Sequence, residues 1–190
     1  NVLKSDIKKF FASIDQSILL RILEKYIEDR DLLWLIGRIV SSFSAGRRGI
    51  GLPLGNLTSQ LFVNVYMNEL DMFIKHTLKA RHYIRYADDF VVMSESKAYL
   101  ENMLPEIKNF LAVQLGLSLH ENKVYIKTYA SGVDFLGWIH FPQHRQLRTA
   151  TRRRLERKLK ANFSPETVAS YKGLLGHGNT HKLQKQLGLI

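Results

Sequence analysis

Two adjacent aspartates, Asp88 and Asp89, lie in the segment YIRYADDFVVMS, between two short apolar runs. The flanking β-branched and aromatic residues favour strands, so the pair is predicted to lie at the tip of a β-hairpin. Adjacent carboxylates raise each other's pKa unless a cation compensates them. Mg²⁺ prefers oxygen ligands and shares them with phosphates, which makes this tip a candidate metal site. A solvated turn is the alternative, because aspartate is common in turns.

A third carboxylate, Asp6, ends an apolar segment over 2–7 that is predicted to form a strand. If this strand pairs beside the hairpin, Asp6 comes close to Asp88. Three carboxylates from two distant segments would then converge.

The remaining periodicity predicts an α+β fold. Strands are predicted over 123–129 and 133–141, joined in a hairpin by Ala130-Ser131-Gly132, and Asp31 is predicted to cap the second helix. An antiparallel sheet with helices on one face accommodates this order. The predicted helices cover 15–29, 32–43, 58–78, 96–115, 149–161, 165–175 and 179–187.

The net charge of +11 is distributed unevenly along the 190 residues. Residues 1–143 hold 17 Lys/Arg against 15 Asp/Glu, whereas residues 144–190 hold 11 against 2. Such asymmetry indicates a polyanionic partner, with a well-solvated tail as the alternative. We expect a larger domain over 1–143 and a helical segment over 144–190.

The chain contains no cysteine, which excludes disulfides and thiolate zinc sites and fits a reducing compartment. No apolar run reaches the length of a membrane span, and no signal peptide is visible. We therefore expect a cytoplasmic protein with no membrane partner. Because the sequence does not begin with Met, we also expect a natural N-terminal part before residue 1.

Five short motifs resemble those of reverse transcriptases. DIKKFF (6–11), GLPLGNLTSQ (51–60) and YADD (86–89) follow the order of motifs A, B and C, LHENK (119–123) looks like motif D, and FLGW (135–138) looks like the primer-grip motif E. The resemblance implies a polymerase palm followed by a small helical thumb. The family's fingers precede motif A and are missing from this sequence, so we expect the segment alone to be weakly active or inactive.

Motif B looks most like that of diversity-generating retroelement reverse transcriptases, which are bacterial or phage-encoded. Retron and group II intron enzymes are similar, but they more often carry Gln where this sequence has Leu54. In the family that Gln contacts the incoming nucleotide. An aliphatic residue there is associated with error-prone copying.

The resemblance implies two Mg²⁺ ions, for which Mn²⁺ can substitute. Asp6, Asp88 and the Ile7 carbonyl would ligate them, and Asp89 would ligate or support the site. Lys123 matches a lysine that donates a proton to the leaving pyrophosphate. The alternative for Lys123 is an ordinary exposed lysine.

The resemblance also assigns residues to the incoming nucleotide. Phe11 matches the aromatic gate that excludes a 2′-hydroxyl, and Phe10 is its rival, because adjacent residues on a strand face opposite ways. Gly55 lets the backbone approach the nucleotide, beside Leu54. Two polar residues of motif B would touch the template or nucleotide, or are ordinary residues of a first helical turn: Ser59 and Gln60.

The remaining assignments concern nucleic acid. Motif E would hold the primer end or pack in the core, through Phe135, Leu136, Gly137 and Trp138. Arg47 and Arg48 would contact template phosphate or are solvated. A basic helix would follow the duplex backbone, with affinity rather than base specificity, through Arg148, Arg152, Arg153, Arg154, Arg157 and Lys158.

These features predict an RNA-directed DNA polymerase whose partners are an RNA template, a DNA primer and dNTPs, with a small accessory protein in the retroelement class. A retron or group II intron-type enzyme is the first alternative. An inactive nucleic-acid-binding module is the second. A nucleotide cyclase of the palm fold is the third, although it would leave the primer-grip and thumb-like segments without a use.

Overall fold

The computed structural model describes residues 1–189 and divides into two compact units, Asn1–Ile126 and Lys127–Ile190. They are called the N-terminal unit and the C-terminal unit below. The division falls before the segment over 133–147, so the motif E hairpin belongs to the same unit as the basic helices. None of the helices over residues 1–189 is both long and apolar enough to cross a membrane.

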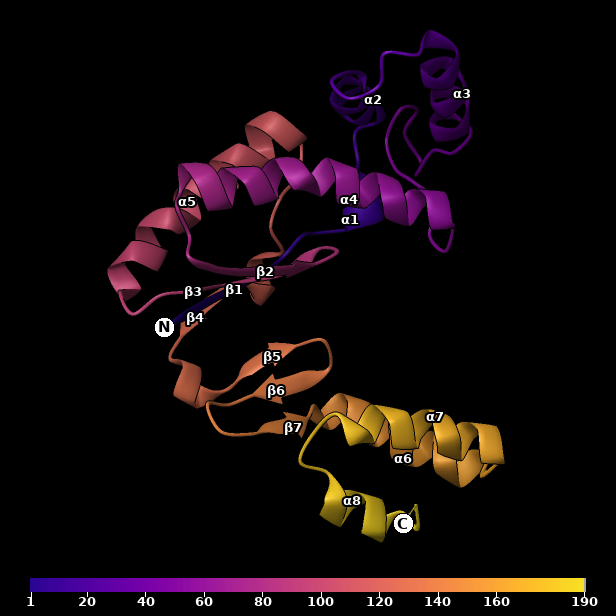
Figure 1. Ribbon diagram of the computed structural model, residues 1–190, viewed down its shortest axis with the longest axis vertical. Coiled ribbons are helices and arrows are strands. Elements are labelled where there is room, and N and C mark those ends of the chain that lie inside the picture. The colour runs from indigo at the N-terminus through magenta and orange to yellow at the C-terminus, as the bar shows by residue number, and fades with distance from the viewer. Residues whose placement is uncertain (190) are drawn as a thin grey trace. The chain divides into compact units, whose positions relative to one another are not determined.

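The N-terminal unit is built on a four-stranded sheet in the order β2-β3-β1-β4 (Figure 1). Its strands are β1 (Val2–Asp6), β2 (His82–Tyr86), β3 (Asp89–Met93) and β4 (Tyr125–Lys127). β3 pairs antiparallel with both β1 and β2, which confirms the predicted hairpin and the position of the first strand beside it.

The register assigns residues to the two faces of the sheet. Leu3 pairs with Val92, and both belong to the hydrophobic core. Because side chains alternate along a strand, Lys4 and Asp6 lie on the opposite face. Asp6 pairs with Asp89, so these two carboxylates share that opposite face.

Helices α4 (Leu57–Met72) and α5 (Lys97–Leu115) cover the core face of the sheet (Figure 1). Phe62, Tyr66 and Leu70 of α4 join Leu100 and Ile107 of α5 in one cluster with the strands. The predicted helix over 58–78 ends as a π-helical turn, η1 (Phe73–Thr77). The structure thus confirms helices on one face of an antiparallel sheet.

Three shorter helices precede α4: α1 (Phe10–Ser13), α2 (Gln16–Glu24) and α3 (Arg30–Ser41). The Asp15 side chain accepts hydrogen bonds from two backbone N–H groups at the start of α2. Asp29, not Asp31, caps α3, because its carboxylate accepts from the N–H groups of Asp31 and Leu32. Such caps satisfy N–H groups that have no partner inside a helix.

The predicted hairpin between 123–129 and 133–141 is wrong. β4 belongs to the first sheet, whereas β5 (Val133–Phe135), β6 (Trp138–His140) and β7 (Arg145–Leu147) form a second, antiparallel sheet. The expected single strand reverses at Leu136 and Gly137, which both have positive φ, as a tight two-residue hairpin turn requires. Residues expected in the turn instead form a short 3₁₀ helix, η3 (Tyr129–Ser131).

The C-terminal unit ends with α6 (Thr149–Ala161), α7 (Pro165–Gly176) and α8 (His181–Gln186). Their positions agree with the predicted helices to within a few residues. Leu155 and Leu159 of α6 pack with Leu175 and Leu189 in a small separate core. This fold leaves the charged residues of α6 on its outer side.

Candidate active site

The carboxylates predicted to act together lie at one end of the N-terminal sheet. Asp6 is the last residue of β1, Asp89 is the first of β3, and Asp88 occupies the turn between β2 and β3. The backbone N–H of Ile7 donates to the Asp88 carbonyl at 3.1 Å, which ties the first strand to the hairpin tip. The structure therefore gathers Asp6, Ile7, Asp88 and Asp89.

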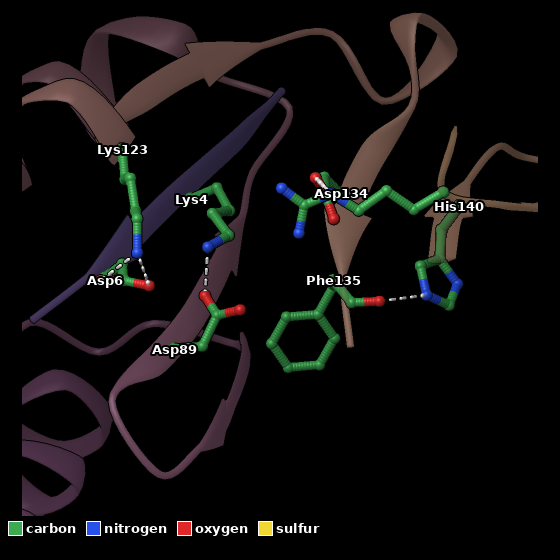
Figure 2. A network of polar contacts seen from close by, with 8 residues as sticks. Lys4, Asp6, Asp89, Lys123, Asp134, Phe135 and His140 are labelled. Atoms are coloured by element: carbon green, nitrogen blue, oxygen red, sulfur yellow. Dashed lines mark hydrogen bonds and ion pairs between the residues drawn. The ribbon is translucent and has the colours of Figure 1, made fainter. Parts of the chain in front are cut away.

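Two lysines compensate the carboxylates (Figure 2). Lys123, which ends the 3₁₀ turn η2 (Glu121–Lys123), places its Nζ 3.0 and 3.1 Å from the two oxygens of Asp6. Lys4 forms an ion pair with Asp89, and only 9% of the Lys4 side chain is exposed. A buried ammonium group of this kind requires a charged partner.

Asp88 differs from its neighbours because no lysine forms an ion pair with it among residues 1–189. Burial raises the pKa of the Asp88 carboxyl, and the negative charge of Asp6 raises it further. Burial also raises the pKa of Asp89, although the bond from Lys4 opposes that shift. A cation between Asp6 and Asp88 would relieve the repulsion.

No group of three or more His, Cys, Asp or Glu side chains within residues 1–189 is arranged to hold a metal ion by itself. Mg²⁺ in proteins is usually held by one or two carboxylates together with water and substrate phosphates. Asp6 and Asp88, close enough for their charges to interact, provide such an oxygen donor set. The residues therefore fit a Mg²⁺ site that substrate completes, rather than a site built from protein alone.

The motif B loop is held to the residues that follow β1. Gln16 Nε2 donates to the carbonyls of Phe43 and Gly51 at 2.7 and 2.9 Å, and Leu52 N donates to the Phe11 carbonyl at 2.8 Å. A Cβ on Gly51 would lie 2.6 Å from Ala45 Cβ, so only glycine fits there. These bonds join motif A to motif B.

Within motif B, the predicted nucleotide residues differ in exposure. Leu54 is 78% exposed beside Gly55, and Gln60 is also exposed on the first turns of α4. Ser59 is 2% exposed, so its hydroxyl faces the protein interior in this structure. Arg47 and Arg48 are exposed in the loop that precedes motif B.

A cavity of about 500 Å³ adjoins the hairpin tip. Phe11 lines it, whereas Phe10 is 4% exposed and belongs to the core. Both residues lie in helix α1 rather than on a strand, but they still face different surroundings. The other lining residues come from α4 and the hairpin: Gln60, Val63, Asn64, Arg85, Tyr86 and Ala87.

In the C-terminal unit, the motif E residues divide between core and surface. Phe135 and Trp138 are 7% and 5% exposed, whereas Leu136 at the hairpin tip is 50% exposed. His140 Nε2 lies 3.2 Å from the Phe135 carbonyl (Figure 2), and Arg148 N donates to the Gly137 carbonyl at 3.0 Å. Phe135 and Trp138 therefore fix the hairpin, while Leu136 and Gly137 form its accessible tip.

The six basic residues predicted to follow a duplex lie at the start of α6 and along it, and all are exposed. Arg148 pairs with Asp134 at 3.0 Å, and Arg152 pairs with Glu156 at 2.8 Å. Four others form no ion pair with any residue of 1–189: Arg153, Arg154, Arg157 and Lys158.

Sequence reasoning missed two cations that hold the hairpin, Lys4 and Arg85. The alternation of side chains along a strand could have identified Lys4, because it lies two residues before Asp6 and therefore on the same face. No local signal identifies Arg85, since its partner Asp71 lies on α4. Only tertiary packing brings Arg85 and Asp71 together.

Comparison with known proteins gives a consistent result. Residues 1–140 match the family model described as reverse transcriptase (RNA-dependent DNA polymerase). The putative COX1/OXI3 intron 2 protein of Saccharomyces cerevisiae is 21% identical over 72% of this chain, and Protein YkfC of Escherichia coli is 25% identical over 80%. The chain spans 23% and 48% of the lengths of these two relatives.

Solved structures share the fold. Apo telomerase from Candida tropicalis, truncated from its C-terminal domain, matches 77% of this chain and 35% of its own, with a TM-score of 0.58 and 13% identity. The foamy viral protease-reverse transcriptase in complex with an RNA/DNA hybrid matches 98% of this chain and 23% of its own, with a TM-score of 0.53 and 19% identity. On the family match, which covers most of its length, the chain belongs to the reverse transcriptase family.

Proposed function

We propose that the protein is an RNA-directed DNA polymerase that adds deoxynucleotides to the 3′ end of a primer, and that it serves a diversity-generating retroelement. The observation that carries the proposal is the pairing of Asp6 with Asp89 across β1 and β3, with Asp88 in the adjoining turn. The family match to residues 1–140 supports it.

The proposed chemistry assigns a role to each part of this site. Asp6, Asp88 and the Ile7 carbonyl would hold Mg²⁺, with Mn²⁺ as a substitute, and Asp89 would support them through its ion pair with Lys4. When bound, the metal supplies charge stabilisation for the attacking and leaving oxygens of phosphoryl transfer. Phe11 would exclude a 2′-hydroxyl from the cavity that it lines.

Lys123 is proposed to hold the proton that pyrophosphate takes up. Its Nζ lies against the Asp6 carboxylate, and half of its side chain is exposed, so it can reach an adjacent phosphate. The exposed tip of the β5–β6 hairpin would hold the primer end. The exposed arginines of α6 would contact duplex phosphates.

Primer extension on poly(rA)/oligo(dT) with Mg²⁺ tests the proposal. The full-length protein is compared with its Asp88→Ala, Asp89→Ala variant and with a control, Glu28→Ala, Asp31→Ala, which removes two exposed carboxylates elsewhere. We expect extension by the parent and the control and none by the double variant. Duplex binding without extension by the parent would support the binding-module alternative, and turnover of free nucleotide without duplex binding would support a cyclase.

The similarity to a yeast intron protein favours a second candidate, an intron-type reverse transcriptase. A substitution at Leu54 distinguishes the retroelement enzyme from the intron-type enzyme. If the aliphatic residue makes copying error-prone, Leu54→Gln lowers the misincorporation rate on a defined RNA template. An unchanged error rate would favour the intron-type enzyme.

A further inference from the structure

The turn that carries Asp88 is fastened to helix α4 by a single arginine. Arg85 Nε and Nη2 donate to the two oxygens of Asp71 at 2.8 and 2.6 Å. Its Nη1 donates to the Ala87 carbonyl at 3.0 Å and lies 3.4 Å from Asn64 Oδ1. One guanidinium therefore joins α4 to the residue immediately before Asp88.

The register explains how Arg85 reaches α4. Arg85 pairs with Phe90, which belongs to the core, so its side chain extends from the face that the helices cover. Ile84 and Tyr86, its neighbours in β2, are 55% and 64% exposed. Only 9% of the Arg85 side chain is exposed, and the Tyr83 hydroxyl donates to Asp71 at 2.7 Å from the same face.

The turn itself has an unfavourable backbone conformation. Ala87 has a φ of 52°, in the left-handed region that residues with a Cβ rarely adopt. Such a conformation persists only where surrounding contacts enforce it, and it is common at functional sites. The Ala87 carbonyl that Arg85 binds belongs to this residue, so the bond holds the turn in the conformation that presents Asp88.

An arginine suits this role better than a lysine. Its planar fork binds both oxygens of Asp71 while its remaining nitrogen donates to the Ala87 carbonyl. A lysine could pair with Asp71, but its single ammonium group cannot reproduce all three contacts in one geometry.

We propose that Arg85 is a positioning residue for the carboxylate pair, acting through the Ala87 carbonyl. Asp71 holds the Arg85 guanidinium in position, and the guanidinium holds the backbone conformation of the turn at Ala87. This inference rests on the proposed polymerase function, in which Asp88 must meet the reacting phosphate.

Arg85→Lys tests the inference in primer extension, with Arg81→Lys, at an exposed arginine outside β2, as the matched control. We expect kcat to fall between about tenfold and about a hundredfold, because small misplacements of catalytic groups have effects of this size. The KM for the dNTP should change much less. An unchanged kcat for Arg85→Lys would overturn the proposal.

A double-mutant cycle with Ala87→Gly separates turn positioning from general stability. Glycine adopts positive φ without the cost that alanine carries, so the turn then depends less on Arg85. We expect Arg85→Lys to lower kcat by a smaller factor in the Ala87→Gly background than in the parent. Equal factors in the two backgrounds would show that Arg85 does not act through this turn.

Hydrogen–deuterium exchange of the 83–94 segment provides a measurement that does not depend on activity. Arg85→Lys should speed exchange in this segment, while exchange in α5 stays as in the parent. If the full-length parent shows no extension but this local effect appears, the proposed function fails and the structural part of the inference stands. Faster exchange throughout the N-terminal unit would instead show a structural role alone.

Discussion

The two units of this protein differ in their balance of charge and in how their charged side chains are paired. The N-terminal unit holds 16 Lys/Arg and 14 Asp/Glu, and its carboxylates at the hairpin tip lie against Lys4 and Lys123 at defined positions. The C-terminal unit holds 12 Lys/Arg and 3 Asp/Glu, and α6 presents arginines that pair with no residue of 1–189, such as Arg153 and Arg154.

These two arrangements of charge suit different kinds of recognition. Paired, partly buried charges are held in one geometry and act over short distances, as phosphoryl transfer requires. Exposed arginines create a positive electrostatic potential that attracts a polyanion and that salt screens. Substitutions at the paired carboxylates and lysines should therefore change catalysis, and substitutions at the exposed arginines should change binding.

The largest expected effect comes from Asp6→Asn. Loss of this carboxylate should lower kcat by about 10³-fold, because metal binding supplies several kcal/mol of charge stabilisation and each 1.4 kcal/mol is a factor of ten. Primer extension measures the rate, and a filter-binding assay should show unchanged duplex affinity. Asp31→Asn, an exposed carboxylate on α3, is the control. Equal rates for the two variants would contradict the assignment.

Leu155→Ala tests whether the C-terminal core supports binding alone. Leu155 is fully buried, so its truncation should cost about 2–5 kcal/mol of unfolding free energy. Because its packing partners all belong to the C-terminal unit, exchange protection in β1–β3 should stay unchanged while duplex binding weakens. Val113→Ala, at a residue 66% exposed, should have an effect within about 0.5 kcal/mol. Loss of exchange protection in both units would show that the C-terminal core also stabilises the N-terminal unit.

Neutralising three arginines of α6 should change the salt dependence of binding. In the variant Arg153→Gln, Arg154→Gln, Arg157→Gln, the slope of log affinity against log salt should fall by roughly one unit for each lost phosphate contact. The kcat at saturating duplex should be preserved. A variant with the same charge change in the N-terminal unit, Lys75→Gln, Lys97→Gln, Lys108→Gln, should keep the parent slope.

The smallest effect concerns Asp88 and pH. Its folded-state pKa is raised by burial and by Asp6, so above that pKa the charged carboxylate destabilises the folded protein. Asp88→Asn should therefore raise the melting temperature at pH 7, and this advantage should disappear as pH falls through the raised pKa and the parent takes up a proton. Thermal unfolding across this range measures the difference. A constant advantage at every pH would exclude Asp88 as its source.

Much of the fold could be predicted from local pattern. The Asp-Asp hairpin and the helix over 149–161 follow from short runs whose periodicity is unambiguous. The prediction failed for the strand over 133–141, because it did not allow for a turn at Leu136 and Gly137. It also failed at Asp31, because Asp29 was equally able to cap α3.

The candidate site was predicted in part. The predicted pairing of the first strand with the hairpin, together with the motif order, was enough to expect Asp6 near Asp88. It could not show that Lys4 and Lys123 would lie against Asp89 and Asp6, because those contacts depend on strand register and on the path of the chain after α5. The choice of Phe11 over Phe10 also depended on which side chain met the core.

The motif order, the hairpin and the concentration of basic residues near the C-terminus follow from local sequence, because each is a property of residue types at short spacing. Which cation pairs with which carboxylate follows instead from tertiary packing. Arg85 meets Asp71 only because β2 and α4 pack together, and Lys4 forms an ion pair with Asp89 because β1 pairs with β3 in this register. Contacts between distant segments depend on the packing of the whole core, which no local pattern specifies.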